Sequence, residues 1–588
     1  MMSPRPSQRL ALATVFAALA VAAPADAACQ LARYIELPVS MWGARPLVAT
    51  QINGKDAQFI LDSGAFYSTI PRAAADQFGL KLQALPPTFR LGGVNGTAHA
   101  SMAYVDDFGL AGVKLPRVSF IVGGTDMGQS GLLGQNILGI GDVEYDLPHG
   151  AVRLFKASDC AIEQLPYWAE GRPVSIVNLE LMTPTQRHTM GTVTLNGVKL
   201  RAVFDTGAPS SILTLAGAKR AGITATSPGV SDAGTSSGLG TGVTRAWRAT
   251  FGLLDIGGEQ IRDPQIRFSA VTLGAADMLI GADFFLTHRI YVSNRLHRMI
   301  LTYEGGPLFG LNPKGVVTTD GATVDLKDTS AAPTDAEGFA RRGSVSLSNQ
   351  KPDDAIADYN EAIRLAPEEA RYYRLRATTR LTKGQPLLAS ADLDMAIQLD
   401  PKDTEAHGIR AALRLGAHDP AGAGEDIKAI DALLPPGAAR RLRLAQMADA
   451  ADLPDLALAN YGAWLDSHKE DAARPGALNG RCWLRGRLDR ELDGALDDCN
   501  AALRMRPGSP AYLDSRAMIR LRQGNWDAAL SDYDAAIKAN PKAGWSLYAR
   551  GLVKAKMGDA AGAKADRDAA LAIDPKLGER AKRFGLDG

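Results

Sequence analysis

Two aspartates stand in the same local sequence. Asp62 begins the tetrapeptide Asp-Ser-Gly-Ala, and Asp205 begins Asp-Thr-Gly-Ala. An apolar run precedes each aspartate, and an Asn-Gly pair opens that run, with Asn53 and Asn196 each nine positions before the aspartate. Asn-Gly between two apolar runs predicts a β-hairpin, because both residues tolerate positive φ. Each copy therefore carries a carboxyl group from the end of a hairpin strand into a turn of small residues.

Two carboxyl groups brought together by such a repeat have a definite chemistry. Like charges that close cannot both ionise, so the pair holds one proton between them. The ionised member can take a proton from water as a general base, while the protonated member polarises a carbonyl group. We therefore predict Asp62 and Asp205 as a catalytic pair.

The residues that follow each aspartate are expected to support it. We predict that the hydroxyls of Ser63 and Thr206 orient the carboxylates and brace the two turns. Gly64 and Gly207 are expected to allow tight turns with unusual backbone angles.

The elements around the two aspartates recur in the same order. After each aspartate come a short helix (72–78 and 215–221), a glycine-rich segment (91–97 and 234–242), an apolar pair followed by Gly134 or Gly281, and two closing strands. These matched landmarks indicate duplication of one unit. Alternating apolar residues, hairpin turns and the lack of a long helical pattern predict two all-β lobes, residues 31–160 and 172–304.

Taken together, these motifs resemble those of the retropepsin-like aspartic proteases, and two units in one chain resemble the two-lobed pepsin-like enzymes. The resemblance covers roughly residues 35–305. It implies an aspartic-type endopeptidase that hydrolyses peptide bonds through an activated water, with no cofactor, metal or covalent intermediate. It also implies that Gly134 and Gly281 lie in structural loops packed under the aspartate pair. The alternative is a non-catalytic interaction protein that keeps the lobes as a peptide-binding scaffold.

The pattern changes after residue 304. Residues 305–335 are rich in Gly, Pro and Ser and predict an exposed linker. From 336 onward, prolines recur at a spacing of 34 residues, at Pro367, Pro401 and Pro435 and again at Pro507, Pro541 and Pro575. That period is typical of tetratricopeptide (TPR) repeats, two antiparallel helices each.

We therefore expect residues 336–588 to form an all-α TPR solenoid of about seven repeats, the fourth degenerate, with a capping helix near 576–584. Its groove is predicted to bind a protein or peptide partner, the alternative being a spacer or assembly surface. The fold class is thus multidomain, an all-β two-lobed aspartic protease fold followed by the solenoid.

The N-terminus predicts export. Arg5 and Arg9 precede an apolar run over residues 10–23, and a small-x-small pattern ends at Ala27, as in a secretory signal peptide spanning 1–27. The alternative, an uncleaved membrane anchor, requires a longer apolar run. We therefore expect a periplasmic protein with no membrane span after signal removal. An oxidising compartment permits disulfides, with the candidates Cys29 with Cys160 and Cys482 with Cys499.

Several other classes of function find no support. A net charge of +1 gives no reason to expect nucleic acid or an anionic membrane as a partner. No Cys-x-x-Cys motif or histidine cluster indicates a metal site. Gly234-x-Ser-x-Gly238 lacks the strand-turn-helix context of a nucleophile elbow. The remaining candidates are interpreted as structural: surface or turn positions for His288 and His297, solvated faces for Asp106–Asp107 and Asp497–Asp498, and packing for Trp42, Trp168 and Trp247, the last also a weak candidate for a substrate subsite.

Overall fold

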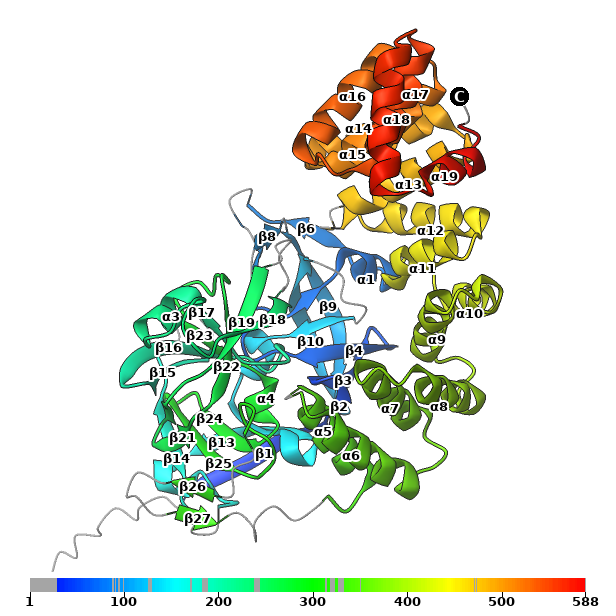
Figure 1. Ribbon diagram of the computed structural model, residues 1–588. Coiled ribbons are helices and arrows are strands. Elements are labelled where there is room, and N and C mark those ends of the chain that lie inside the picture. The colour runs from blue at the N-terminus through cyan, green and yellow to red at the C-terminus, as the bar shows by residue number, and fades with distance from the viewer. Residues whose placement is uncertain are drawn as a thin grey trace, which may run out of the picture.

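The computed structural model of the chain describes residues 29–586, except for 87–88, 90, 94–95, 99, 125–129, 170–171, 182–188, 237–243, 312–314, 318–322, 326–332, 349, 470 and 472. A β-rich region comes first and a run of helices follows it (Figure 1). The predicted multidomain fold class is therefore confirmed. The predicted signal peptide and the tip of the second glycine-rich segment lie outside the described residues.

The first lobe is built on an eight-stranded sheet with the order β2-β3-β4-β11-β5-β10-β9-β6. Its glycine-rich segment forms a separate two-stranded hairpin, as predicted. The elements are β2 (Ser40–Trp42), β3 (Arg45–Ile52), β4 (Lys55–Leu61), β5 (Thr69–Ile70), α1 (Arg72–Gln77), β6 (Leu82–Ala84), β7 (Leu91–Gly93), β8 (Gly96–Ala98), β9 (Ala100–Leu110), β10 (Val113–Gly123), β11 (Gly131–Leu133) and α2 (Gln135–Leu138).

The second lobe repeats this plan in an eleven-stranded sheet with the order β18-β19-β22-β17-β23-β16-β15-β20-β21-β26-β27. Its elements are β15 (Met190–Leu195), β16 (Val198–Phe204), β17 (Ile212–Thr214), α3 (Leu215–Arg220), β18 (Ser231–Ser236), β19 (Thr244–Thr250), β20 (Leu253–Ile256), β21 (Glu259–Arg262), β22 (Gln265–Ser269), β23 (Met278–Ile280), α4 (Ala282–Phe285), β26 (Gly315–Val317) and β27 (Thr323–Asp325).

A third sheet joins the lobes, with the order β1-β13-β12-β24-β25-β14. Its central pairing, β12 to β24, aligns Val143 with Val292 and so crosses from one lobe to the other. Buried Glu144 accepts hydrogen bonds from Arg153 of its own lobe and Arg289 of the other. The strands are β1 (Gln30–Pro38), β12 (Asp142–Asp146), β13 (Ala151–Ser158), β14 (Ser175–Asn178), β24 (His288–Ser293) and β25 (Arg298–Tyr303), with the short turns η1 (Leu147–His149) and η2 (Ile162–Gln164).

The interpretation of 305–335 as an exposed linker is wrong for part of that segment. Leu308 and Phe309 are buried in the core of the lobes, and β26 pairs with β21 of the second lobe. Both residues are large and apolar, so burying them outweighs the turn preference of the neighbouring Gly and Pro residues.

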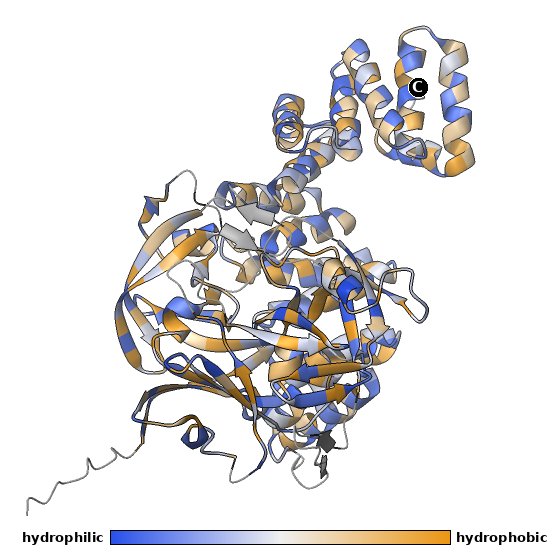
Figure 2. Ribbon diagram, turned by 90° about the vertical axis from the view of Figure 1, so that its left-hand side faces the viewer, coloured by the Kyte–Doolittle hydropathy of each residue, from blue (hydrophilic) through white to orange (hydrophobic). Residues whose placement is uncertain are grey.

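The helical part forms seven antiparallel pairs within the described residues, followed by one short helix (Figure 1). Figure 2 shows that orange and blue positions alternate around these helices, as expected of amphipathic elements. The pairs are α5 (Ala336–Ser348) with α6 (Pro352–Leu365), α7 (Ala370–Thr382) with α8 (Pro386–Leu399), α9 (Thr404–Gly416) with α10 (Pro420–Leu433), α11 (Arg440–Ala450) with α12 (Pro454–Ser467), α13 (Arg474–Leu488) with α14 (Leu492–Met505), α15 (Pro510–Arg522) with α16 (Trp526–Ala539), and α17 (Gly544–Lys556) with α18 (Ala560–Ile573), and the last helix is α19 (Leu577–Arg583).

An arginine on the first helix and an aspartate on the second join the two helices of six pairs. The N···O distances are 2.6–2.8 Å, and in five of these pairs a second cation one turn further along also contacts the aspartate. The ion pairs are Arg342–Asp358, Arg376–Asp392, Arg410–Asp426, Arg481–Asp498, Arg516–Asp532 and Arg550–Asp566. The fourth pair departs from this pattern, because Arg441 there contacts Asn460.

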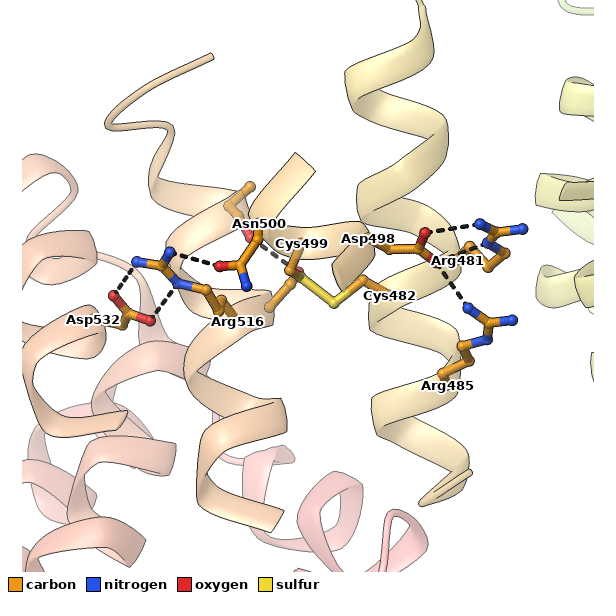
Figure 3. Close-up of a disulfide and its surroundings, with 10 residues drawn as sticks. Arg481, Cys482, Arg485, Asp498, Cys499, Asn500, Arg516 and Asp532 are labelled. Atoms are coloured by element: carbon orange, nitrogen blue, oxygen red, sulfur yellow. Dashed lines mark hydrogen bonds and ion pairs between the residues drawn. A yellow bond between two sulfur atoms is a disulfide. The ribbon is translucent and has the colours of Figure 1, made fainter. Parts of the chain in front are cut away.

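Figure 3 shows the fifth pair, in which a disulfide joins Cys482 of α13 to Cys499 of α14. Beside it, Asp498 is buried and bound by Arg481 and Arg485. The prediction of a solvated face at Asp497–Asp498 is therefore wrong for Asp498. A second disulfide joins Cys29 to Cys160 at the interlobe sheet.

The solenoid packs against the first lobe. Helix α5 contacts β2 and η1, and its Val345 joins the core of the lobes. Further along, Trp42 of β2 donates from its indole nitrogen to Glu405 of α9 at 3.1 Å, and α12 contacts α1. A polar cavity of about 630 Å³ lies between β4 and the helices α7, α9 and α11. The first four repeats therefore lie against the first lobe, whereas α13–α19 extend beyond it (Figure 1).

The Arg–Asp pairs give a stability prediction. Asp426→Ala leaves Arg410 and Arg414 without their buried counter-charge, so we expect a loss of about 3–5 kcal/mol. Urea unfolding of the helical part, monitored by circular dichroism, measures this loss of unfolding free energy. The exposed neighbour provides the control, since Glu425→Ala should change stability by less than about 0.5 kcal/mol. Equal effects of the two substitutions would contradict the structural role of the pair.

Candidate active site

Both aspartates leave the sheets by the predicted route. The Asn-Gly turns have positive φ at both central residues, 50° and 78° at Asn53 and Gly54, and 50° and 79° at Asn196 and Gly197. This is the turn that matches the twist of two-residue hairpins. It joins β3 to β4 and β15 to β16, so the hairpin prediction is confirmed in both lobes.

Each aspartate is then fixed by a neighbouring parallel strand. β4 pairs with β11, and β16 pairs with β23. The backbone N–H of Asp62 donates to Leu133 at 3.0 Å, and that of Asp205 donates to Ile280 at 2.8 Å. Each aspartate thus leaves the end of a hydrogen-bonded strand, with Asp62 buried and Asp205 half-buried.

Four reciprocal hydrogen bonds lock the two turns together. The Ser63 hydroxyl donates to Phe204 O at 2.8 Å, and the Thr206 hydroxyl donates to Leu61 O at 2.7 Å. Each hydroxyl also accepts the backbone N–H of the other residue at 3.0 Å. Ser63 and Thr206 therefore brace the turns across the two lobes, as predicted, while backbone amides orient the carboxylates.

Gly64 and Gly207 are required for a different reason from the one predicted. Neither adopts positive φ, so the expected unusual backbone angles are absent from these two residues. A Cβ at Gly64 would lie 2.5 Å from the carboxyl carbon of Asp205, and one at Gly207 would lie 2.6 Å from that of Asp62. Glycine therefore lets each carboxyl group approach the turn of the opposite lobe.

The two carboxyl groups lie close enough for each to change the pKa of the other. Burial raises the pKa of Asp62, and the negative charge of Asp205 raises that pKa further, well above its ordinary value. Burial also raises the pKa of Asp205, but the hydrogen bond from Asp62 and the amides of Gly207 and Ala208, at 2.8 and 3.2 Å, oppose that rise. The pair therefore holds one proton more readily than two separate carboxyl groups would, with the larger rise in pKa at Asp62.

Arg45, at the start of β3, is a site residue that the sequence did not reveal. Its Nε donates to Gly207 O of the other lobe at 3.1 Å, and its guanidinium lies 5.6 Å from the Trp42 ring centroid. Burial lowers the pKa of Arg45, and the charges of Asp205 and Asp62 oppose that shift. Its positive charge in turn lowers the pKa of Asp205. A basic residue far from the Asp motif in sequence gives no local signal for this contact.

A matched layer supports the turns. A Cβ at Gly134 or Gly281 would lie 2.7 Å from the backbone of the turn in its own lobe. The next contact is also duplicated, because Ser68 binds Asn136, and Ser211 binds Asp283, with hydroxyl distances of 2.7 Å in both lobes. The sequence contains this signal: each serine stands six positions after its aspartate, and Asn136 and Asp283 each stand two positions after the glycine.

Other predicted positions fall outside this site. His288, predicted at the surface, is instead buried; its Nε2 lies 3.0 Å from Glu259 and its ring stacks on Phe284. Trp168 is buried, and Trp247 stacks on Phe268 beside β18. Among the described residues, no group of three or more His, Cys, Asp or Glu side chains is placed to hold a metal ion. In that same part of the chain, no helix combines the length and the apolar character needed to cross a membrane.

Comparisons with known proteins agree with this geometry. A family model described as "gag-polyprotein putative aspartyl protease" matches residues 48–139 and again 191–287, so each match contains one aspartate of the pair. A tetratricopeptide repeat model matches residues 336–369. The N-terminal region is therefore aspartyl-protease-like, and the C-terminal region carries a TPR repeat. No curated protein matches this chain.

Solved structures similar to this chain include two TPR proteins and a pilus biogenesis factor. A tetratricopeptide repeat protein from Parabacteroides merdae is 14% identical, with 42% of this chain and 98% of that chain covered and a TM-score of 0.33. PilW, a type IV pilus biogenesis factor, is 15% identical, with 36% and 96% covered and a TM-score of 0.31. YrrB, a TPR protein with an unusual peptide-binding site, is 18% identical, with 38% and 97% covered and a TM-score of 0.24.

The shared proton predicts a pH-dependent effect on stability. Because folding raises the pKa of Asp62, the wild type loses stability as the pH rises through that value, whereas the amide introduced by Asp62→Asn does not titrate. The stability of Asp62→Asn relative to the wild type should therefore increase as the pH rises. The expected gain is about 1.4 kcal/mol for each pH unit by which folding raises the pKa of Asp62. Unfolding of the β-rich region at about pH 3 and about pH 8 measures the difference.

A control for the loss of any carboxyl group is Asp56→Asn, at an exposed position on β4. A gain that is the same at both pH values for Asp62→Asn would show that the proton is not held by this pair.

Proposed function

We propose that this chain is an aspartic-type endopeptidase in which Asp62 and Asp205 activate a water molecule for peptide hydrolysis. One observation carries the proposal: two duplicated motifs, joined by braced turns, each bring a carboxyl group against the turn of the opposite lobe, where a glycine leaves room for it. The matches of both halves to an aspartyl protease family model support it.

The mechanism follows from the unequal carboxyl groups. The water oxygen attacks the peptide carbonyl carbon while ionised Asp205 takes a proton from that water. At the same time Asp62 donates its proton to the carbonyl oxygen. The resulting tetrahedral diol collapses when the pair returns a proton to the leaving nitrogen and takes one from a hydroxyl of the diol. The C–N bond breaks, and the products are a carboxylic acid and an amine. Each step moves protons only between the dyad, water and substrate.

The competing reading is a peptide-binding scaffold without turnover. Such a protein has no need to hold two carboxyl groups in a costly buried contact, since removing either one would relieve the repulsion. The preserved contact therefore supports hydrolysis over binding alone.

We further propose that the protein is exported, acts in the periplasm, and recruits a protein or peptide through its repeats. The signal-like N-terminus and the two disulfides support export, because such bonds persist in oxidising compartments. The first four repeats face the first lobe, so the last three are the better candidates for recruitment.

Cleavage of an unfolded protein between acidic and neutral pH tests the proposal. Asp62→Asn and Asp205→Asn should each lower kcat/KM by at least about a thousandfold, because each removes one of the two proton-transfer groups. A pepstatin-type inhibitor should abolish wild-type cleavage.

The chain offers a matched control in Asp283→Asn. This change places in the second lobe the residue that the first lobe already has at Asn136, and it retains the oxygen that accepts from Ser211. The variant should keep at least about half of the activity, since it touches no reacting group. Full activity of either dyad variant, with the fold intact, would contradict the mechanism.

Arg45 predicts a shift of the acidic limb of the pH–rate profile. Its charge lowers the pKa of Asp205, so Arg45→Met should raise that pKa and move the acidic limb to higher pH, by up to about 1 unit. Arg45→Lys keeps the charge and should shift the limb less. Profiles of kcat/KM against pH measure this shift. An acidic limb at the wild-type pH in an active Arg45→Met enzyme would refute the effect of Arg45 on the pKa of Asp205.

A further inference from the structure

The last described residues of the chain turn back at the end of α19. Gly585 has a φ of 64°, its N–H donates to Lys582 O, and the N–H of Leu586 donates to Ala581 O, both at 2.9 Å. This pattern is a Schellman motif, which sets the direction of the chain after the helix. The segment from Phe584 to Leu586 is thus held in one defined position.

That segment contacts three successive repeats through their first helices. The Phe584 ring lies 6.1 Å from Trp483 of α13 and 5.4 Å from Trp545 of α17, both edge to face. The guanidinium of Arg487 lies 5.9 Å from the Phe584 ring centroid. Between these helices, Arg522 at the end of α15 donates to the carbonyl oxygen of Phe584.

Covering the end of the solenoid does not require these contacts. Leu577 and Ala581, each 1% exposed, already cover the last repeat, where Leu577 packs with Leu547 and Ala570. Phe584 instead reaches α13, two repeats back, and stays half-buried. The segment thus crosses the repeats with one aromatic side chain between two tryptophans and one backbone carbonyl bound by an arginine, contacts that a separate peptide could also make.

The contacts of the C-terminal segment also leave one hydrogen-bond donor of this face without an acceptor. The indole nitrogen of Trp545 is buried and, among the described residues, has no hydrogen-bond partner. An unpaired buried donor is unfavourable, and a ligand with an acceptor at this point would remove that cost. The chain's own tail is therefore an imperfect occupant.

We propose that the face formed by Trp483, Arg487, Arg522 and Trp545 is a binding site for a partner peptide, and that the chain's own C-terminal segment competes for it. The peptide presents an aromatic side chain to the two tryptophans and a backbone carbonyl to Arg522. The site lies on the repeats that extend away from the β lobes (Figures 1 and 2). The inference deepens the recruitment role in the proposed function but does not depend on catalysis.

A labelled copy of the tail tests the competition. The probe is the fluorescein-labelled heptapeptide Lys-Arg-Phe-Gly-Leu-Asp-Gly, with the sequence of residues 582–588. It is titrated by fluorescence anisotropy against the full chain carrying Asp205→Asn, so that cleavage cannot contribute. Because a competing tail lowers the fraction of open sites, Phe584→Ala should bind the probe at least about tenfold more tightly than its parent.

Two controls establish that the probe binds at the proposed site. A probe with alanine in place of phenylalanine should not bind, and Trp483→Leu added to Phe584→Ala should abolish the gain. Binding within twofold of the parent, in a Phe584→Ala protein whose helical melting is unchanged, would overturn the proposal and leave the tail as a structural cap.

If Phe584→Ala loosens the last repeats, hydrogen exchange on the protein with its native tail decides instead. Probe at about 1 mM, comparable to the effective concentration of a tethered segment, should displace the tail and speed exchange at Gly585 and Leu586. Unchanged exchange at these two amides would likewise overturn the proposal. Neither result depends on protease activity. The proposal of peptide binding by the last repeats can therefore be refuted independently of the proposal of peptide hydrolysis.

Discussion

The β-rich region depends on one constraint, the close approach of two carboxyl groups, each held against the turn of the opposite lobe. Such a pair repels itself once both members ionise, so the surrounding chain must hold it in place at all times. The reciprocal hydrogen bonds of Ser63 and Thr206 hold the pair in place because they join each turn directly to the other. The pairing of β12 with β24 extends the same connection into a continuous sheet. Neither lobe alone can present a complete site.

The pair becomes chemically unequal although its supports are nearly symmetric. The turns, the parallel strands and the Ser68 and Ser211 contacts repeat from lobe to lobe, so backbone geometry alone would give both carboxyl groups similar pKa values. Arg45 contributes to the difference, because its charge adds to the amides of Gly207 and Ala208 in favouring the ionised form of Asp205. Fusing the two units in one chain permits such a difference, since each copy can change its sequence independently.

The parts of the structure that the sequence predicted are those carried by local patterns. The Asn-Gly turns, the short helices and the 34-residue repeat each follow from residues close together in the chain. Arg45, His288 and Asp498 were missed or misassigned for a shared reason, since each depends on a partner brought near only by folding. Leu308 and Phe309 show the same limit, because a segment rich in turn residues became part of the core through two apolar side chains. The action of Asp62 and Asp205 on a substrate stays a proposal.

The packing of the solenoid against the first lobe divides the repeats into two groups with different surroundings. Glu405 of α9 accepts from Trp42, whose ring packs against Arg45, which in turn binds Gly207 beside the aspartate pair. The third repeat is thus linked through Trp42 to Arg45, and the first repeats pack against the lobe that carries Asp62. The last three repeats lie beyond this contact, and their first helices hold the C-terminal segment instead. A partner bound there would be tethered beside the lobes without disturbing Arg45, so recruitment and the balance of the dyad can vary independently.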